Sequence, residues 1–499
     1  MAAGFSQPRI GESAAWIFRA NFVRWMEHER AIPAIFKSQA GMKRERNSAR
    51  HLGSPDAVDP AEYTPFFSYR AARNGGASGA SLHCEAAELE RIAQAAGTPV
   101  YAYSRASIEA AYRRLDRAFR GVPHSLCYAM KANSNLSVVR VLARLGSRFD
   151  IVSGGELDRL RRLGVGGDRI VFSGVGKSRE EIRRAIEYPG KGSAARRGIL
   201  LFNVESAAEF EILHEEAERH MKAGGRRVSL AIRVNPDVLA GGHPHISTGH
   251  HHHKFGMDWA EARRLFLAQR ASRWIAWKGI SAHIGSQILS AAPYRRALAR
   301  LASYVRELVR EGIRLEFLDI GGGLGIRYTR ERALDPGDYA KALMSIAKPL
   351  GCHLLLEPGR TLVGPAGVLL TRVIYVKENR GKKFVIVDAA MNDLIRPVLY
   401  GAVHPTTKAR RPAGPGARKE NVDIVGPVCE SGDYLARNWP LEPVEAGDLL
   451  VIWAAGAYAF VQSSNYNARP RPAEVLVEGK NFRIVRARQT YDDLVRGER

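Results

Sequence analysis

The chain has 499 residues, of which 75 are Lys or Arg and 51 are Asp or Glu, so its formal net charge is +24. This length predicts two or three domains, and a content of 45% hydrophobic and 25% charged residues excludes a wholly disordered chain. No apolar run approaches the roughly 18 residues of a transmembrane helix, so we expect no membrane partner. The four cysteines lie far apart without a CxxC pair. Their spacing argues against a disulfide scaffold or a zinc site and favours a reducing, cytoplasmic compartment.

The positive charge is compatible with nucleic-acid binding, for which basic residues supply most of the affinity. The arginines, however, are scattered along the whole chain, and the densest group is the short segment Lys408–Arg411 followed by Arg418 and Lys419. We interpret the charge as an arginine-rich composition and expect no nucleic-acid partner. A basic nucleic-acid binder that uses the N-terminal residues is kept as a rival hypothesis.

Residues 1–62 carry the least regular pattern. They mix Trp, Phe and Arg without a steady period and then become polar, with Pro, Gly and Ser. They contain no apolar stretch that ends in a small-residue cleavage site, so we expect no secretory signal and interpret them as a flexible extension. Residues 63–103 follow, and the run Thr98–Tyr103 predicts a strand that joins a later β domain from its N-terminal side.

Residues 104–357 alternate short apolar runs with amphipathic segments. Eight runs predict buried strands: Ser125–Met130, Arg148–Val152, Arg169–Gly174, Gly198–Val204, Val228–Asn235, Gly279–Ile284, Leu315–Ile320 and His353–Glu357. Helical periodicity fills the gaps at Asn135–Leu145, Glu156–Leu163, Ser178–Tyr188, Glu205–His220, Asp258–Gln269, Ala291–Glu311 and Tyr339–Leu350. Eight strands alternating with helices over about 250 residues are typical of a (β/α)8 barrel.

Residues 358–499 predict a second, mainly β domain. Its expected strands are Gly367–Lys377, Lys382–Asp388, Asn421–Gly426, Leu449–Ala454, Ala473–Glu478 and Phe482–Arg488. The segment Arg410–Arg418 is rich in Pro, Gly and Arg and is expected to be a mobile loop.

Reacting groups of such barrels lie at the C-terminal ends of the strands. Lys131 follows the first expected strand and His283 ends the sixth, while the glycines Gly321–Gly323 and the turn Glu357–Arg360 follow the seventh and eighth. A glycine turn brings backbone N–H groups close to an anion, and a neighbouring arginine adds a charged donor. Each feature alone is more often a rim charge or an ordinary turn. Together they predict a phosphate-bearing ligand that faces a lysine and a carboxylate.

Two other patterns are set aside. Gly174–Ser178 imitates a phosphate-binding loop, but the glycine required four residues earlier is Val171, so an ordinary strand-to-helix turn is favoured. The histidines His243, His245 and His250–His253 lie in a Gly- and Pro-flanked loop without nearby cysteines, so we expect no physiological metal.

The motifs as a set resemble a known family over about four fifths of the chain, from Phe67 to the C-terminus. They are Tyr128-Ala-Met-Lys-Ala-Asn133, Ser153-Gly-Gly-Glu156, His283-Ile-Gly-Ser-Gln287, Asp319-Ile-Gly-Gly-Gly323, Glu357-Pro-Gly-Arg360, Arg396-Pro-Val-Leu-Tyr400, Cys429-Glu-Ser-Gly-Asp433 and Gly456-Ala-Tyr458. In this order they resemble fold-type III decarboxylases dependent on pyridoxal 5'-phosphate (PLP), which have an alanine racemase-like fold. The similarity is strongest to the diaminopimelate decarboxylases of lysine biosynthesis.

The resemblance implies a role for each matching residue. Lys131 matches the lysine that carries PLP covalently, and Cys429 the proton donor, which the other subunit of a homodimer supplies. The implied cofactor-binding residues are Lys131, His283, Ser286, Gly323, Glu357, Pro358, Gly359, Arg360 and Tyr458. The implied substrate-binding residues are Arg360, Arg396, Tyr400, Glu430 and Tyr458.

The implied reaction is decarboxylation of meso-2,6-diaminopimelate to L-lysine and CO2 by a homodimer with shared active sites. The two arginines complement the distal carboxylate of this substrate, whereas an enzyme that forms a simple diamine needs an acidic distal site. A decarboxylase of ornithine, arginine or a carboxylated polyamine remains the alternative, together with a non-catalytic PLP carrier, which lacks the large β domain. Two positions depart from the family pattern, Ser281 in place of a histidine and Ala390 in place of a glycine. They concern local loop geometry and not the reaction.

Overall fold

The computed structural model describes residues 59, 61, 64–71, 79–189, 198–238, 254–411 and 418–499. All of them belong to one compact unit, Pro55–Arg499. The extension expected over residues 1–62 lies almost entirely outside the described residues, as do the histidines His243, His245 and His250–His253 and positions 412–417 of the expected loop. Among the described residues, no helix combines the length and the apolar character needed to cross a bilayer.

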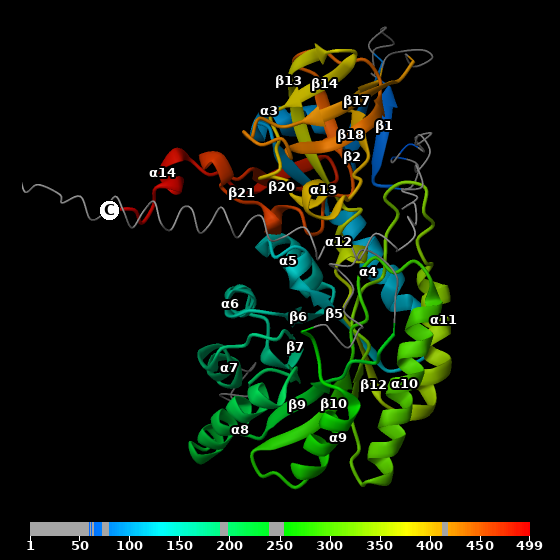
Figure 1. Cartoon of the computed structure of the whole chain (residues 1–499), viewed down its shortest axis with the longest axis vertical. Helices are drawn as coiled ribbons and strands as arrows, with labels where there is room; N and C mark the ends of the chain where they lie inside the picture. Colours follow the sequence, from blue (N-terminus) through cyan, green and yellow to red (C-terminus); the bar gives the residue numbers. More distant parts are fainter. Residues whose placement is uncertain are drawn as a thin grey trace, which may run out of the picture. The chain divides into compact units, whose positions relative to one another are not determined.

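Eight parallel strands close into a barrel in the order β10-β11-β12-β5-β6-β7-β8-β9, which confirms the predicted fold (Figure 1). The strands are β5 (His124–Ala129), β6 (Arg148–Ile151), β7 (Ile170–Phe172), β8 (Leu201–Val204), β9 (Val228–Arg233), β10 (Ile275–Ser281), β11 (Phe317–Asp319) and β12 (His353–Leu356). All eight lie on or beside their predicted ranges. The largest difference is at β10, which begins four residues before the expected Gly279. Its pairing with β9 has a register shift between Trp277 and Gly279, so the strand is not regular over its whole length.

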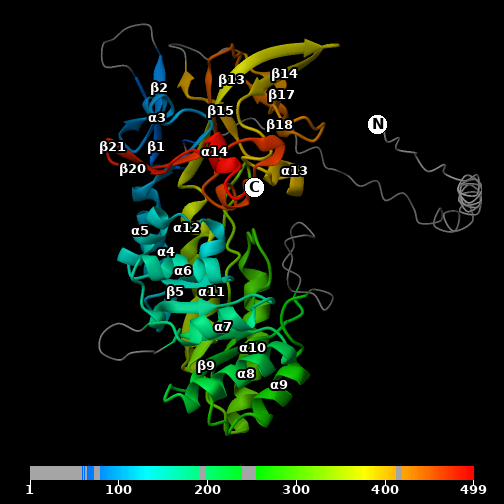
Figure 2. The ribbon, with the colours of Figure 1, turned by 90° about the vertical axis from the view of Figure 1, so that its left-hand side faces the viewer.

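Helices follow the strands on the outside of the barrel, and Figure 2 shows α6, α7 and α8 next to one another there. The barrel helices are α4 (Arg105–Ala118), α5 (Leu136–Arg144), α6 (Gly154–Arg162), α7 (Arg179–Ile186), α8 (Ala207–Lys222), α9 (Trp259–Ala268), α10 (Ala291–Arg310) and α11 (Pro336–Ala347). Several start at a side-chain cap, as Ser153 accepts from Glu156 N–H and Ser206 from Glu209 N–H. Helix α11 begins three residues before the expected Tyr339, since Asp335 caps it and Pro336 suits the first helical position.

A nine-stranded sheet forms most of the β domain. Its main path is β18-β17-β14-β13-β4-β20-β21, and β19 with β15 extends it from β13. The strands are β4 (Val100–Ser104), β13 (Gly367–Asn379), β14 (Lys382–Val387), β15 (Thr406–Lys408), β17 (Glu420–Val425), β18 (Tyr434–Leu441), β19 (Leu449–Ile452), β20 (Ala473–Glu478) and β21 (Asn481–Arg486). Strand β4 comes from the N-terminal side and lies between β13 and β20. Strand β18 was not predicted, because Asn438 with φ of 47° and Pro440 break its alternation.

A small second sheet was also missed by the sequence pattern. It joins β1 (Phe67–Ala71), β2 (Ala80–Cys84), β3 (Ala87–Glu88) and β16 (Arg410–Arg411), and α3 (Leu89–Ala96) follows it. The expectation of a loop from Arg410 is therefore wrong for its first two residues, which pair with Ser81 and Ala80 of β2. Short helices α12 (Arg360–Val363), α13 (Arg396–Tyr400) and α14 (Tyr491–Leu494) complete the described elements of this region.

An apolar layer fills the barrel interior below the strand ends. It consists of side chains from six different strands: Cys127, Val171, Leu201, Ala231, Phe317 and Leu355. Side chains alternate along a strand, so the residue two positions later points to the same side. Here those residues are polar or small: Ala129, Ser173, Asn203, Arg233, Asp319 and Glu357. The sequence thus places a polar layer on an apolar floor, at the end of the barrel where active sites of this fold occur.

Candidate active site

Eight residues predicted from the sequence line one pocket at this end of the barrel. They are Lys131, His283, Ser286, Gly323, Glu357, Gly359, Arg360 and Tyr458. Pro358 does not line it, but its carbonyl accepts a hydrogen bond of 3.1 Å from Ala129 N–H and so holds the turn against β5. The pocket is therefore lined by residues that are far apart in the sequence.

Lys131 lies on a short 3₁₀ turn, Met130–Ala132, directly after β5. Its Nζ donates to Oδ2 of the fully buried Asp150 at 2.6 Å. Burial lowers the pKa of Lys131, but the carboxylates of Asp150 and Glu357 outweigh it and raise this pKa above its ordinary value. The ammonium group is thus held at the centre of a set of carboxylates.

The carboxyl group of Glu357, which lines the pocket, shares a hydrogen bond with that of Asp319. Burial raises the pKa of Asp319 to about 6, although the Gly321 N–H and the Asn203 amide both donate to it. Burial also raises the pKa of Glu357 well above its usual range, and the charges of Asp150 and Asp319 raise it further. This crowding favours the approach of an additional cationic group to Glu357.

His283 is held as a neutral imidazole above this cluster. Burial lowers its pKa well below the ordinary value, and the charges of Arg233 and Lys131 lower it further. Its Nδ1 accepts from Gly322 N–H at 3.1 Å, which leaves the proton on Nε2. Arg233 is itself held by Glu205, with Nη1 to Oε1 at 2.7 Å.

The glycines after β11 allow a close approach of backbone that any side chain would prevent. Gly323 has φ of 92°, and a Cβ built on it would lie 2.1 Å from the carbonyl oxygen of Gly285. A Cβ on Gly322 would lie 2.1 Å from the carbonyl oxygen of Glu357. With the Ser286 hydroxyl, the backbone amide of Gly323 forms the type of donor set that binds a phosphate group.

The β domain closes the pocket through the loop that carries Tyr458. The Tyr458 N–H donates to Ala132 O at 2.8 Å, and the Asn133 amide donates to Gly456 O at 3.1 Å. Tyr458 adopts φ of 55°, and its ring faces the Arg360 guanidinium, with 4.9 Å between ring centroid and Cζ. The loop is therefore anchored directly to the turn that bears Lys131.

Two buried arginines meet beside the pocket. Arg360 and Arg396 both donate to the hydroxyl of Tyr328, at 2.5 Å and 2.8 Å. Burial lowers the pKa of Arg396, and the nearby charge of Arg360 also acts against its ionised form. Among the described residues, no ion pair joins either arginine to a carboxylate. Their positive charges therefore remain available to an anionic ligand.

The remaining predicted residues do not line the pocket within one chain. Cys429 is exposed, and its N–H donates to the Asn467 side chain at 2.8 Å. Glu430 lies next to it and interacts with the hydroxyl of Tyr466. Tyr400 accepts from the Gln462 amide at 3.3 Å. The structure thus separates these residues from Lys131 and its neighbours.

The turn that imitates a phosphate-binding loop proves to be structural. Lys177 is buried and donates to Glu209 at 2.6 Å, and also to the carbonyls of Gly174 and Asn203. Ser178 caps α7 in a reciprocal arrangement with Glu181. The prediction of an ordinary strand-to-helix turn is confirmed.

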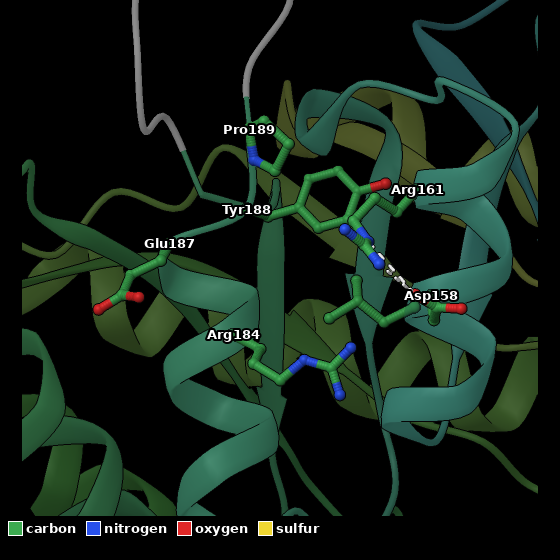
Figure 3. A pocket seen from close by; sticks show the side chains of 7 residues that line it. Asp158, Arg161, Arg184, Glu187, Tyr188 and Pro189 are labelled. Atoms are coloured by element: carbon green, nitrogen blue, oxygen red, sulfur yellow. Dashed lines mark hydrogen bonds and ion pairs between the residues drawn. The ribbon is translucent and has the colours of Figure 1, made fainter.

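A separate pocket lies on the outer surface, between α6 and the end of α7 (Figure 3). Its wall includes Asp158 and Arg161, which form an ion pair of 2.7 Å, and Tyr188, whose hydroxyl donates to Val165 O. It contains none of the predicted site residues.

Several residues around the pocket were not assigned from the sequence. Asp150 and Asn203 could have been found, since they are polar residues at the ends of predicted strands. Asp319 begins the motif Asp319–Gly323, but the sequence pattern indicated no role for it. Tyr328 and His404 lie in loops, and no local pattern marks them.

A lysine, a buried carboxyl group and a glycine turn thus lie together at the end of the barrel where active sites of this fold occur. A family model described as the pyridoxal binding domain of pyridoxal-dependent decarboxylases matches residues 105–364. A diaminopimelate decarboxylase of Pseudomonas aeruginosa is 48% identical over 421 residues, which are 84% of this chain and 97% of that protein. One of Aquifex aeolicus is 42% identical over 437 residues, covering 87% of this chain and 97% of that protein.

Solved structures agree with these relatives. The diaminopimelate decarboxylase of Helicobacter pylori in complex with L-lysine has a TM-score of 0.76 and 38% identity, over 82% of this chain and 98% of that one. The diaminopimelate decarboxylase of M. jannaschii, also in complex with L-lysine, has a TM-score of 0.78 and 35% identity, over 86% of this chain and 97% of that one. The chain belongs to the diaminopimelate decarboxylase family.

Proposed function

We propose that this protein converts meso-2,6-diaminopimelate to L-lysine and CO2, the last step of lysine biosynthesis, with PLP as its cofactor. The observation that carries the proposal is the pair of buried arginines, Arg360 and Arg396, beside a pocket that contains Lys131 and Glu357. A distal carboxylate of the substrate suits these arginines, whereas a distal ammonium alone does not. The relatives named above support the same substrate.

The residues of the pocket fit PLP. Lys131 would carry it covalently, His283 would face its ring, and Glu357 would pair with its pyridine nitrogen. The Ser286 hydroxyl and the amides around Gly323 and Gly359 would hold its phosphate, and Tyr458 would approach it from the β domain. When bound, PLP accepts the electrons of the bond that breaks as CO2 leaves.

The chain supplies orientation, charge and protons. Glu357 would keep a nitrogen opposite it protonated, because the neighbouring carboxyl groups of Asp150 and Asp319 favour an added positive charge there. Arg360 and Arg396 hold the distal end of the substrate, with Tyr400 and Glu430 as further substrate-binding residues. Asp150 lies 2.6 Å from the Lys131 Nζ, where it can retain the ammonium form once this lysine is displaced.

We also propose a homodimer with shared sites, in which a second copy supplies Cys429 as the proton donor, together with Glu430. The exposure of Cys429 and its separation from Lys131 within one chain support this arrangement. Mixing inactive Lys131→Ala and Cys429→Ala proteins in equal amounts should restore about a quarter of the wild-type activity, since random pairing leaves one intact site in half of the dimers. No recovery would contradict the shared site.

The domain division and the compartment are part of the same proposal. Residues 63–103 and 358–499 form one β domain that contacts one end of the barrel of residues 104–357, as the pairing of β4 with β13 and β20 supports. The reaction is proposed to take place in the cytoplasm, where the four unpaired cysteines would remain reduced.

The test is an assay joined to a labelling experiment. Purified protein loaded with PLP should release CO2 from meso-diaminopimelate, and borohydride should attach the cofactor permanently to the peptide that contains Lys131. Lys131→Ala should lose both the attachment and the activity. Attachment at a different lysine would contradict the site.

A further inference from the structure

Tyr328 lies in the loop after β11, and its hydroxyl is the point at which the two buried arginines meet. Arg360 Nη1 donates to it at 2.5 Å and Arg396 Nη1 at 2.8 Å. Both guanidinium groups also face its ring, with 5.8 Å and 5.4 Å between Cζ and the ring centroid. Tyr328 itself is buried, at 8% exposure. One side chain therefore contacts both arginines.

His404 provides a second neutral acceptor for Arg396. Its Nε2 lies 3.1 Å from Arg396 Nη1, and its Nδ1 lies 2.8 Å from the carbonyl oxygen of Trp453. A carbonyl oxygen only accepts, so Nδ1 carries the proton and Nε2 accepts from the arginine. Burial and the charge of Arg396 lower the pKa of His404 to about 3, so the ring is uncharged at neutral pH. Its edge packs against the Tyr328 ring, with centroids 5.3 Å apart.

The nature of these partners decides what the arginines can bind. A carboxylate at either position would neutralise a guanidinium and weaken its attraction for an anionic ligand. Tyrosine and neutral histidine satisfy the N–H groups of the arginines but leave both positive charges in place. The same two charges repel a ligand whose distal end carries only an ammonium group.

We propose that Tyr328 and His404 are positioning residues that determine specificity. They hold Arg360 and Arg396 apart and leave both positive charges without a negative partner. The site therefore selects amino acids with a distal carboxylate. This inference rests on the proposed function, because it takes the distal end of diaminopimelate as the group that the arginines bind. The product L-lysine keeps that amino-acid end and should use the same contacts, whereas cadaverine carries no carboxylate.

Tyr328→Phe tests the proposal by removal of a single oxygen. The KM for meso-diaminopimelate and the inhibition constant of L-lysine should both rise about tenfold, as expected when a charged group loses a hydrogen bond, while kcat stays within about threefold. The inhibition constant of cadaverine should not change. Tyr375→Phe, at an exposed tyrosine of β13, is the matched control and should resemble the wild type. If KM and the L-lysine constant both stay within about twofold in Tyr328→Phe, the proposal is wrong.

A pair of variants at His404 separates positioning from packing. His404→Gln retains an acceptor and should keep KM near the wild-type value, whereas His404→Phe lacks one and should raise KM without loss of bound PLP. Equal KM values for the two His404 variants would overturn the role of His404. If His404→Phe does not fold, the KM of Tyr328→Phe still decides the proposal. The Kd of L-lysine, measured by calorimetry for the wild type and for Tyr328→Phe, tests the loss of affinity without turnover. Failure of the wild type to decarboxylate diaminopimelate would instead contradict the proposed function.

Discussion

Arg396→Ala removes a guanidinium group that the surrounding residues hold in one place. Arg396 is only 5% exposed, and its Nη1 donates to the Tyr328 hydroxyl at 2.8 Å and to His404 Nε2 at 3.1 Å. Since no ion pair neutralises it among the described residues, a substrate carboxylate gains a charged hydrogen bond worth about 1.5–3 kcal/mol. At about 1.4 kcal/mol for each factor of ten, the KM for meso-diaminopimelate should rise roughly 10- to 150-fold.

The assay is steady-state release of CO2 by PLP-loaded protein, with kcat and KM determined separately. Arg396→Lys keeps the charge but loses the planar pair of donors, so its KM should lie between those of the wild type and the alanine variant. Arg372→Ala is the control, because Arg372 lies in the β domain and pairs with Glu90 instead of facing the pocket. An unchanged KM in Arg396→Ala would refute the assignment of this arginine to the substrate carboxylate.

Three further predictions concern the cofactor, pH and helix capping. Gly323→Ala should reduce retention of PLP at least about tenfold, because the new Cβ would lie 2.1 Å from Gly285 O. Retention is measured by cofactor absorbance after dialysis, and full retention would contradict the assignment of this turn to the phosphate. In cofactor-free protein, Asp319 binds its proton more tightly when folded, with a pKa of about 6 against an ordinary 3.8, so stability should fall as pH rises from about 4 to 6. Because Glu156, Asp393 and Glu357 also have raised pKa values, thermal unfolding of Asp319→Asn should show a smaller fall than the wild type, and an identical pH profile would contradict the role of Asp319. Ser178→Ala should lower the free energy of unfolding by about 1 kcal/mol through loss of the α7 cap and leave kcat unchanged; a large loss of activity would reopen a ligand role for this turn.

The barrel could be predicted because its strands are continuous apolar runs and its helices carry a clear 3.6-residue period. The same reasoning failed where the alternation is interrupted, as at β18 with Asn438 and Pro440, or where strands are very short, as at β3 and β16. Pairing over long sequence distances forms these elements, and no local pattern reports it.

The candidate site divides in the same way. Lys131, His283 and Glu357 could be found because each follows a predicted strand and lies in a distinctive motif. Tyr328 and His404 could not, since they meet Arg396 only through tertiary packing, and Tyr328 is 68 positions before Arg396 in the chain. The electrostatic relation among the buried carboxyl groups also depends on burial and distances that no sequence motif encodes.

The most direct measurement of the central claim is the ratio of kcat/KM for meso-diaminopimelate to kcat/KM for L-ornithine, L-arginine and L-lysine, determined with one PLP-loaded preparation. A site that pairs buried donors with a substrate group strongly rejects analogues that lack it. The account predicts a preference for meso-diaminopimelate of at least about a hundredfold, with L-lysine formed in equal amount to CO2. Equal or greater kcat/KM for any of the other three amino acids would contradict it.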